Sequence, residues 1–132
     1  MRQIIKDIEI TIDGSPVGFR LSKLDAFSGI TLLRLLMRLE EQHPNPAMLD
    51  LIASLSEDEL RSVMTSVFNH ISVLLPAGPH PVMTGSEWGY PELEHDTPTC
   101  MKLLLEGIAW SLSGFFSGGR SGPEAAPAAT AP

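Results

Sequence analysis

The segment Ala26–Gln42 constrains the fold more than any other part of the sequence, because as a helix it is apolar around most of its circumference. Its polar residues fall in one narrow stripe with helical spacing: Thr31, Arg34, Arg38 and Glu41. Nearly all positions between them are apolar: Ile30, Leu32, Leu33, Leu35, Leu36, Met37 and Leu39. A helix of this kind lies at the centre of a fold or shares its surface with a partner.

Two segments of alternating hydrophobicity precede this helix and predict a β-hairpin. Apolar and polar residues alternate along residues 4–12 and again along residues 17–24. The residues between them are typical of a turn, because Gly14 permits a positive φ and Pro16 cannot extend a central strand. A lone hairpin is only marginally stable in water. We therefore expect its apolar face to pack on helices or its edge to pair with another chain.

The next part of the sequence predicts a short helix over residues 47–54 and a longer one that begins at Ser56. Ser56 and Glu59 have the spacing of a capping box. Apolar residues then continue at helical spacing as far as Ile71, and Pro76 ends the helix. One face of this helix carries Val63, Val67 and Phe68. We expect it to be buried against the leucines of the first helix, namely Leu32, Leu35 and Leu36.

Residues 76–98 hold five prolines and three glycines without a clear period, which predicts a long loop around Trp88. Thr97 and Pro98 are typical of an N-cap followed by proline in the first turn, so we expect the last helix to begin there. One stripe of that helix faces the core, and a second stripe contains Leu103 and Trp110.

After residue 116 the composition changes to glycine, proline, alanine and serine without any large apolar residue. Such a segment buries too little surface to offset its ordering entropy. The sequence therefore predicts one α+β domain over residues 1–116, in which an N-terminal β-hairpin packs on a mainly α-helical bundle. Residues 117–132 are interpreted as a disordered tail or linker.

Composition excludes several classes of function. Sixteen acidic against nine basic residues give a net charge of −7, which opposes binding to nucleic acid or to anionic membranes. The longest apolar run, residues 101–116, is short and contains charged residues, so no membrane span is expected. One cysteine excludes an intramolecular disulfide framework and fits a reducing cytoplasm.

Candidate catalytic residues match no signature. A metal site would have to combine residues whose spacing fits no zinc motif: His80, His95, Asp96 and Cys100. Cys100 near a helix N-terminus is a candidate nucleophile, but no family signature surrounds it. We therefore expect no enzyme activity and no cofactor. A small enzyme that uses the loop between Trp88 and His95 remains an alternative.

The aromatic end of the last helix is the candidate partner-binding surface. Trp110, Phe115 and Phe116 are followed at once by the predicted tail, which leaves little chain to cover them. Together with Leu103 they form the predicted site, and exposed aromatic residues often anchor a partner. The alternative is that these side chains close the core. The spare apolar surface also predicts a homo-oligomer.

The order of these elements resembles a known family. The hairpin leads into Phe19-Arg20-Leu21-Ser22-Lys23-Leu24-Asp25-Ala26, of the form F-R-L-x-K-L-x-A. A leucine-rich helix, an acid-capped helix, a Pro/Gly loop and a helix ending in Phe115-Phe116 follow. Over residues 4–116 this order resembles the tail assembly chaperones of long-tailed bacteriophages and prophages, encoded just before the tape measure protein.

The resemblance implies a non-enzymatic protein of the bacterial host cytoplasm. Such chaperones bind and solubilise the tape measure protein, help to recruit tail tube subunits and are absent from the mature virion. In many relatives a frameshift near the gene's end adds a C-terminal domain, for which residues 117–132 would serve as linker. The rival hypothesis is a structural tail or connector component whose hairpin adds to a neighbour's sheet.

Overall fold

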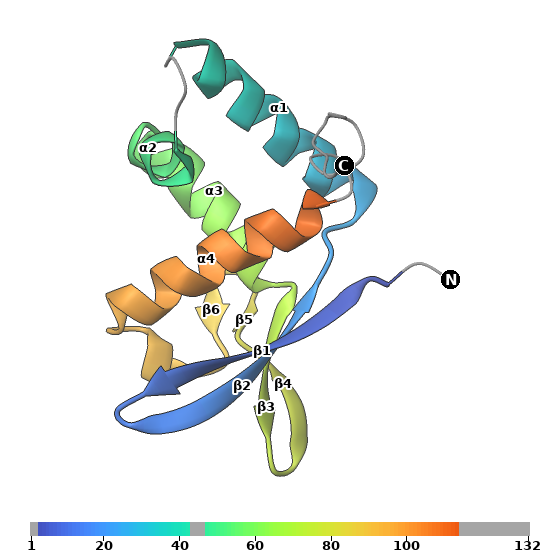
Figure 1. Ribbon diagram of the computed structural model, residues 1–132, viewed down its shortest axis with the longest axis vertical. Helices are drawn as coiled ribbons and strands as arrows, with labels where there is room; N and C mark the ends of the chain where they lie inside the picture. The colour runs from blue at the N-terminus through green and yellow to red at the C-terminus, as the bar shows by residue number, and fades with distance from the viewer. Residues whose placement is uncertain (1–2, 43–46, 114–132) are drawn as a thin grey trace, which may run out of the picture.

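The computed structural model describes residues 3–42 and 47–113, and these residues form an α+β fold. The elements in chain order are β1 (Ile5–Ile12), β2 (Ser15–Ser22), α1 (Ala26–Gln42), α2 (Met48–Ala53), α3 (Glu57–Phe68), β3 (Ile71–Leu75), β4 (Gly78–Pro81), β5 (Met83–Thr84), β6 (Glu87–Trp88), the 3₁₀ helix η1 (Pro91–Leu93) and α4 (Thr97–Ser111). The strands form a four-stranded sheet in the order β1-β2-β3-β4 and a separate pair, β5-β6. The helices gather on one side of the larger sheet, with α4 nearest to it (Figure 1).

The predicted hairpin is confirmed as β1 and β2. Asp13 and Gly14 both have positive φ, 51° and 80°, as the tight turns that connect such strands require. The antiparallel register places Ile8 opposite Phe19, and Phe19 is fully buried. The apolar side of the alternating pattern therefore faces the core.

The hairpin packs on α4, as expected, but its β2 edge pairs with a strand of the same chain and not with another chain. β2 pairs with β3, with Phe19 opposite Val73 and Leu21 opposite Ile71. The helix expected to reach Ile71 ends instead at Phe68. Ile71 and Val73 are buried in strand β3, because pairing with β2 supplies a hydrogen-bonded ladder that a longer helix would lack.

The prediction of one long loop over residues 76–98 is also wrong. The chain forms β4, the β5-β6 pair and η1 there, and its side chains Val82 and Leu93 are fully buried. Asn69 holds the turn of the small pair in place: it donates to the Gly85 carbonyl oxygen and accepts from the Gly85 amide, both at 2.9 Å. Trp88 packs on Phe68 with ring centroids 5.9 Å apart. This segment is therefore part of the core.

The two edges of the four-stranded sheet differ. β4 carries Pro79 and Pro81, which lack the N–H needed for further pairing. β1 forms the opposite edge over eight residues without proline, and Ile5 at its start is exposed. Only the β1 edge is therefore suited to accept another strand.

Helix α4 fills the centre of the fold. Its N-cap is Asp96, one residue before the predicted Thr97, since the Asp96 side chain accepts from the Thr99 amide at 3.2 Å. Its buried residues are Thr99, Cys100, Leu103, Leu104, Gly107 and Ile108. At Gly107 the contact with α3 is so close that a Cβ atom would lie 2.6 Å from Val67 Cγ1. Among the described residues, no helix is long and apolar enough to cross a membrane.

Candidate functional site

The structure removes Leu103 from the predicted partner-binding surface. Its side chain is fully buried, because α4 lies between the sheet and α3. Phe115 and Phe116 lie outside the described residues, as does the predicted tail at 117–132. Of the four predicted site residues, only Trp110 is described as partly exposed.

Trp110 joins the end of α4 to strand β1. Its indole N–H donates to the Ile4 carbonyl oxygen at 3.3 Å. The ammonium groups of Lys23 and Lys6 lie 4.7 Å and 5.8 Å from the ring centroid, within cation–π range. Nearby, the Ser111 hydroxyl accepts from the Leu24 amide at 3.1 Å. These contacts give Trp110 a structural role where the chain enters α1.

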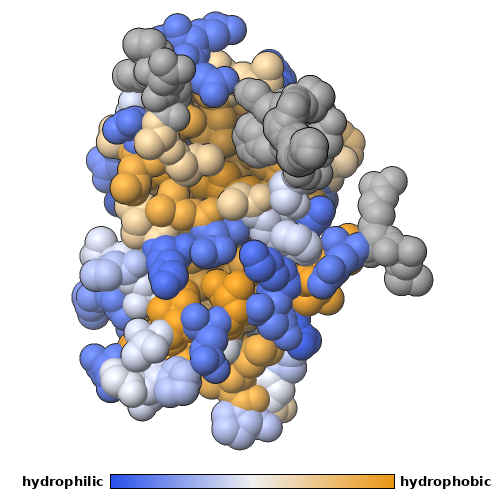
Figure 2. All heavy atoms as spheres, in the orientation of Figure 1, coloured by the Kyte–Doolittle hydropathy of each residue, from blue (hydrophilic) through white to orange (hydrophobic). Residues whose placement is uncertain are grey.

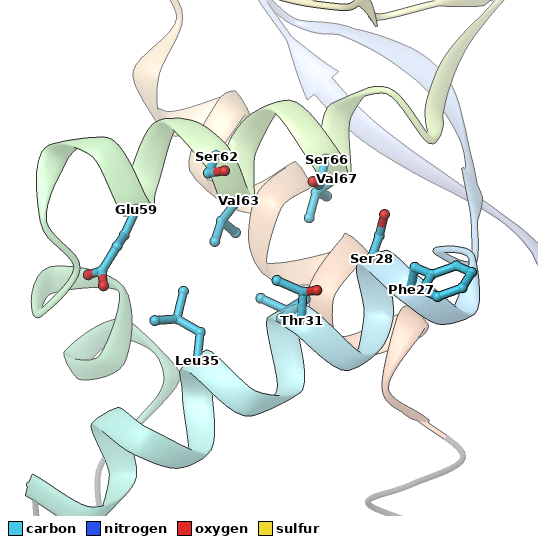
Figure 3. A pocket seen from close by; sticks show the side chains of 10 residues that line it. Phe27, Ser28, Thr31, Leu35, Glu59, Ser62, Val63, Ser66 and Val67 are labelled. Atoms are coloured by element: carbon cyan, nitrogen blue, oxygen red, sulfur yellow. The ribbon is translucent and has the colours of Figure 1, made fainter.

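A groove between α1 and α3 is the best candidate for a binding site. It has a volume of about 380 Å³. Its walls are partly apolar and partly formed by short hydroxyl side chains: Ser28, Thr31, Leu32, Leu35, Ser62, Val63, Ser66 and Val67. Figure 3 shows Leu35 on α1 and Val63 on α3 pointing toward each other across it. Short side chains allow a docked helix to approach closely.

The structure corrects the predicted packing of α3 against α1, because α3 packs mainly on α4. Val63, Val67 and Phe68 are buried, as predicted. Part of the expected interface with α1 is open, however, because Leu35 lines the groove wall opposite Val63. Phe68 instead contacts Trp88 from the segment whose structure the sequence did not predict.

The two ends of the groove differ in polarity. Phe27 lies at one end with 87% of its surface exposed. At the other end Glu59 forms an ion pair with Arg38 of α1. The pKa of the Glu59 carboxyl is lowered, first by the hydrogen bond from the Ser56 amide in the capping box and then by Arg38. A capping interaction and an ion pair thus fix the charged end.

Exposed apolar surface continues from the groove along α1. Ile30 and Met37 keep 57% and 50% of their surface exposed. Apolar side chains gather in the upper part of the molecule, which the helices occupy in the same orientation (Figure 2). Patches of this kind on soluble proteins mark interaction surfaces. The sequence indicated spare apolar surface on this helix but did not single out Phe27. The one feature that could have pointed to Phe27 was its position in the first turn of the helix.

The α1 wall is also basic. Arg34 and Arg38 line a shallow hollow with Thr31 and Leu35, and these last two residues also line the groove. Arg34 is exposed, and within the described parts of the chain it forms no ion pair. The first turn of α3 is acidic through Glu57, Asp58 and Glu59. Of these charged residues only Glu59 lines the groove itself, and Arg34 and Arg38 border it in the hollow beside α1.

The candidate catalytic residues have structural partners. Cys100 is buried; its thiol donates to the Leu93 carbonyl oxygen at 3.1 Å, and burial raises its pKa, which disfavours the reactive thiolate. His80 Nε2 lies 2.8 Å from the Gly89 carbonyl oxygen. Across residues 3–42 and 47–113, no three His, Cys, Asp or Glu side chains are grouped to hold a metal. The chain matches no protein-family model, no curated protein and no solved structure at a significant level.

Proposed function

We propose that this protein is a non-enzymatic tail assembly chaperone that binds an apolar helical segment of the tape measure protein in the α1–α3 groove. The observation that carries the proposal is a groove with apolar walls beside a phenylalanine that is 87% exposed. The resemblance of residues 4–116 to the chaperone family supplies the partner.

The physical basis is the burial of apolar surface by an amphipathic helix. Full burial of an exposed phenylalanine contributes about 1.5–3 kcal/mol, so Phe27 is a suitable anchor at the groove's end. Ser28, Ser62 and Ser66 let the partner's backbone approach the walls. Helix-in-groove binding buries one face of the partner and leaves its polar face in water. This is the chemistry needed to keep a long apolar helical protein soluble.

The remaining parts of the proposal follow from the resemblance. The chaperone acts in the bacterial host cytoplasm, brings tail tube subunits to the coated tape measure protein and is absent from the finished particle. The exposed Ile30 and Met37 beside the groove support self-association along the partner, because one groove leaves them uncovered.

One observation favours the alternative of a structural tail or connector component. The β1 edge lacks the prolines that protect β4, so a neighbouring subunit could add a strand there. The Ile5 side chain is exposed at this edge. In that case the protein would remain in the assembled particle.

Two variants separate these functions. Phe27→Ala should weaken co-purification with the co-expressed tape measure protein, whereas Ile5→Ala at the β1 edge should leave it unchanged. Leu49→Ala is a matched control, because Leu49 on α2 is 56% exposed and does not line the groove. Equal retention by Phe27→Ala and wild type would overturn groove binding. Detection of the protein in purified particles by mass spectrometry would favour the structural component.

A further inference from the structure

The charge beside the α1 wall of the groove opposes the charge of the whole chain. The protein has a net charge of −7, which repels acidic ligands at long range. Along α1, however, Arg34 is exposed and forms no ion pair with any described residue. It lies one helical turn after Thr31 and directly before Leu35, and it shares a shallow hollow with these two groove-lining residues. A ligand in the groove would therefore meet an unpaired positive charge on its α1 side.

The first turn of α3, at the Glu59 end of the groove, carries the opposite sign, and of its acidic residues Glu59 lines the groove. Glu57, Asp58 and Glu59 form this turn, and only Glu59 has a cationic partner on α1. Glu57 pairs with Arg61 of its own helix, one turn further along α3. An acidic side chain on the α3 side of the groove would add to existing negative charge, which is unfavourable.

We propose that the groove selects a helix whose apolar stripe is flanked by acidic residues on one side, and that this flank lies along α1 beside Arg34. The proposal rests on the groove-binding function proposed above and names the chemistry of its ligand. A helix in a groove has two flanks, and reversing its direction exchanges them. An acidic flank therefore fixes the direction in which the helix docks as well as its affinity.

The test uses the full chain and two designed amphipathic helical peptides with the same Leu/Ala stripe. One peptide carries Glu along one flank, and the other carries Lys at the same positions. Fluorescence polarisation should show that the Glu peptide binds about two- to fivefold more tightly for each ion pair at low salt. The difference should shrink as salt rises. Attraction by net charge alone gives the opposite order, with the Lys peptide bound more tightly.

Variants that change the charge at single positions test whether Arg34 causes the preference for the Glu peptide. Arg34→Gln should abolish the preference for the Glu peptide, and Arg34→Glu should reverse it. Arg61→Gln is the matched control, because Arg61 is an exposed arginine on α3 that lines neither the groove nor the adjoining hollow that contains Arg34, and it should leave the preference unchanged. Both replaced residues are exposed, so we expect the three variants to stay folded, and circular dichroism checks this.

The direction in which the peptide docks is measured separately, with a spin label. A spin label at the peptide N-terminus should broaden amide NMR signals near only one end of the groove, either around Phe27 or around Glu59. A peptide with its Glu residues moved to the opposite flank should broaden the other end. Equal affinity for both peptides, tighter binding of the Lys peptide, or broadening at both ends would overturn the inference. If Phe27→Ala still weakens binding in that case, the groove function stands. Binding of neither peptide would overturn both proposals.

Discussion

Helices α1 and α4 have similar apolar sequences and opposite positions in the fold. In α4, Leu103 and Ile108 are completely buried, whereas Phe27 and Ile30 in α1 are 87% and 57% exposed. α4 lies between the sheet and α3, and α1 lies at the far side of the helical layer (Figure 1). Apolar composition therefore indicates that a helix needs a partner, and the topology decides whether that partner is within the same chain.

The difference in burial between α1 and α4 indicates where a binding surface is to be expected. The sequence places the aromatic end of α4 next to a segment without large apolar residues, and this adjacency led to the prediction of a site there. In the structure, Leu103 is enclosed and Trp110 contacts β1. The exposed apolar surface lies on α1, which packs on one side and is open along the groove.

The largest expected effect is on the free energy of unfolding when one apolar side chain in each helix is replaced by alanine. Leu103→Ala should reduce the free energy of unfolding by about 2–5 kcal/mol, because it leaves a cavity in the core. Phe27→Ala should change it by less than about 0.5 kcal/mol, because an exposed side chain loses few contacts. Urea denaturation measures both. Similar losses for the two variants would contradict the contrast between the helices.

Adding a methyl group to one glycine in each helix should have effects of opposite sign. Gly107→Ala should destabilise the fold by about 1–3 kcal/mol, because the new Cβ would lie 2.6 Å from Val67 Cγ1. Gly29→Ala in α1 should stabilise it by up to about 1 kcal/mol through helix propensity, since the nearest atom is Leu24 Cβ at 4.0 Å. Thermal unfolding of the two variants measures both changes in stability. A stable Gly107→Ala protein would show that α3 and α4 are less closely packed.

The segment that covers α3 on its other side provides a third test. Asn69→Ala removes both hydrogen bonds to Gly85 and should lower the free energy of unfolding by about 1–2 kcal/mol. Hydrogen exchange should rise around β5 and β6 and change little in α1. An increase of the same size in α1 would show that the two regions open together.

The smallest expected effect is the pH dependence of the Glu59 cap. Its carboxyl pKa is lower in the folded state than in the unfolded chain, so its stabilising contribution is complete above the unfolded value of about 4.3. This contribution is lost as pH falls through the folded pKa. Glu59→Gln keeps an oxygen for the cap and should flatten the pH dependence in this range. Denaturation at neutral and acidic pH tests it, and an unchanged profile would contradict the assignment.

Local signals in the sequence predicted much of the fold. The turn at Gly14, the helix Ala26–Gln42 and the capping box of Ser56 and Glu59 depend on neighbouring residues, and all three are confirmed. Ile71 was assigned to a helix because it satisfies both the helical spacing and the alternation of a strand. Pairing with β2, about 50 residues earlier in the chain, decides between them.

The burial of other residues could not be predicted, because it depends on parts of the chain that are distant in sequence or on segments without a periodic pattern. Val82 lies between β4 and β5, and Leu93 lies in the three-residue η1, so both are buried in segments too short for a period to mark them. Whether Leu103 faces core or solvent depends on β3 and on the segment that follows it. The groove could not be derived from the sequence either, because it depends on how far apart α1 and α3 lie.

Burial of the single cysteine provides a direct measure of how the molecule opens. Cys100 is 9% exposed, and its thiol is held against Leu93 of η1, so a thiol reagent reaches it only when this contact breaks. The labelling rate of the unmodified protein then reports the frequency of that opening. Cys100 does not line the α1–α3 groove. A ligand in the groove should therefore slow labelling only if the opening that exposes Cys100 also separates α1 from α3.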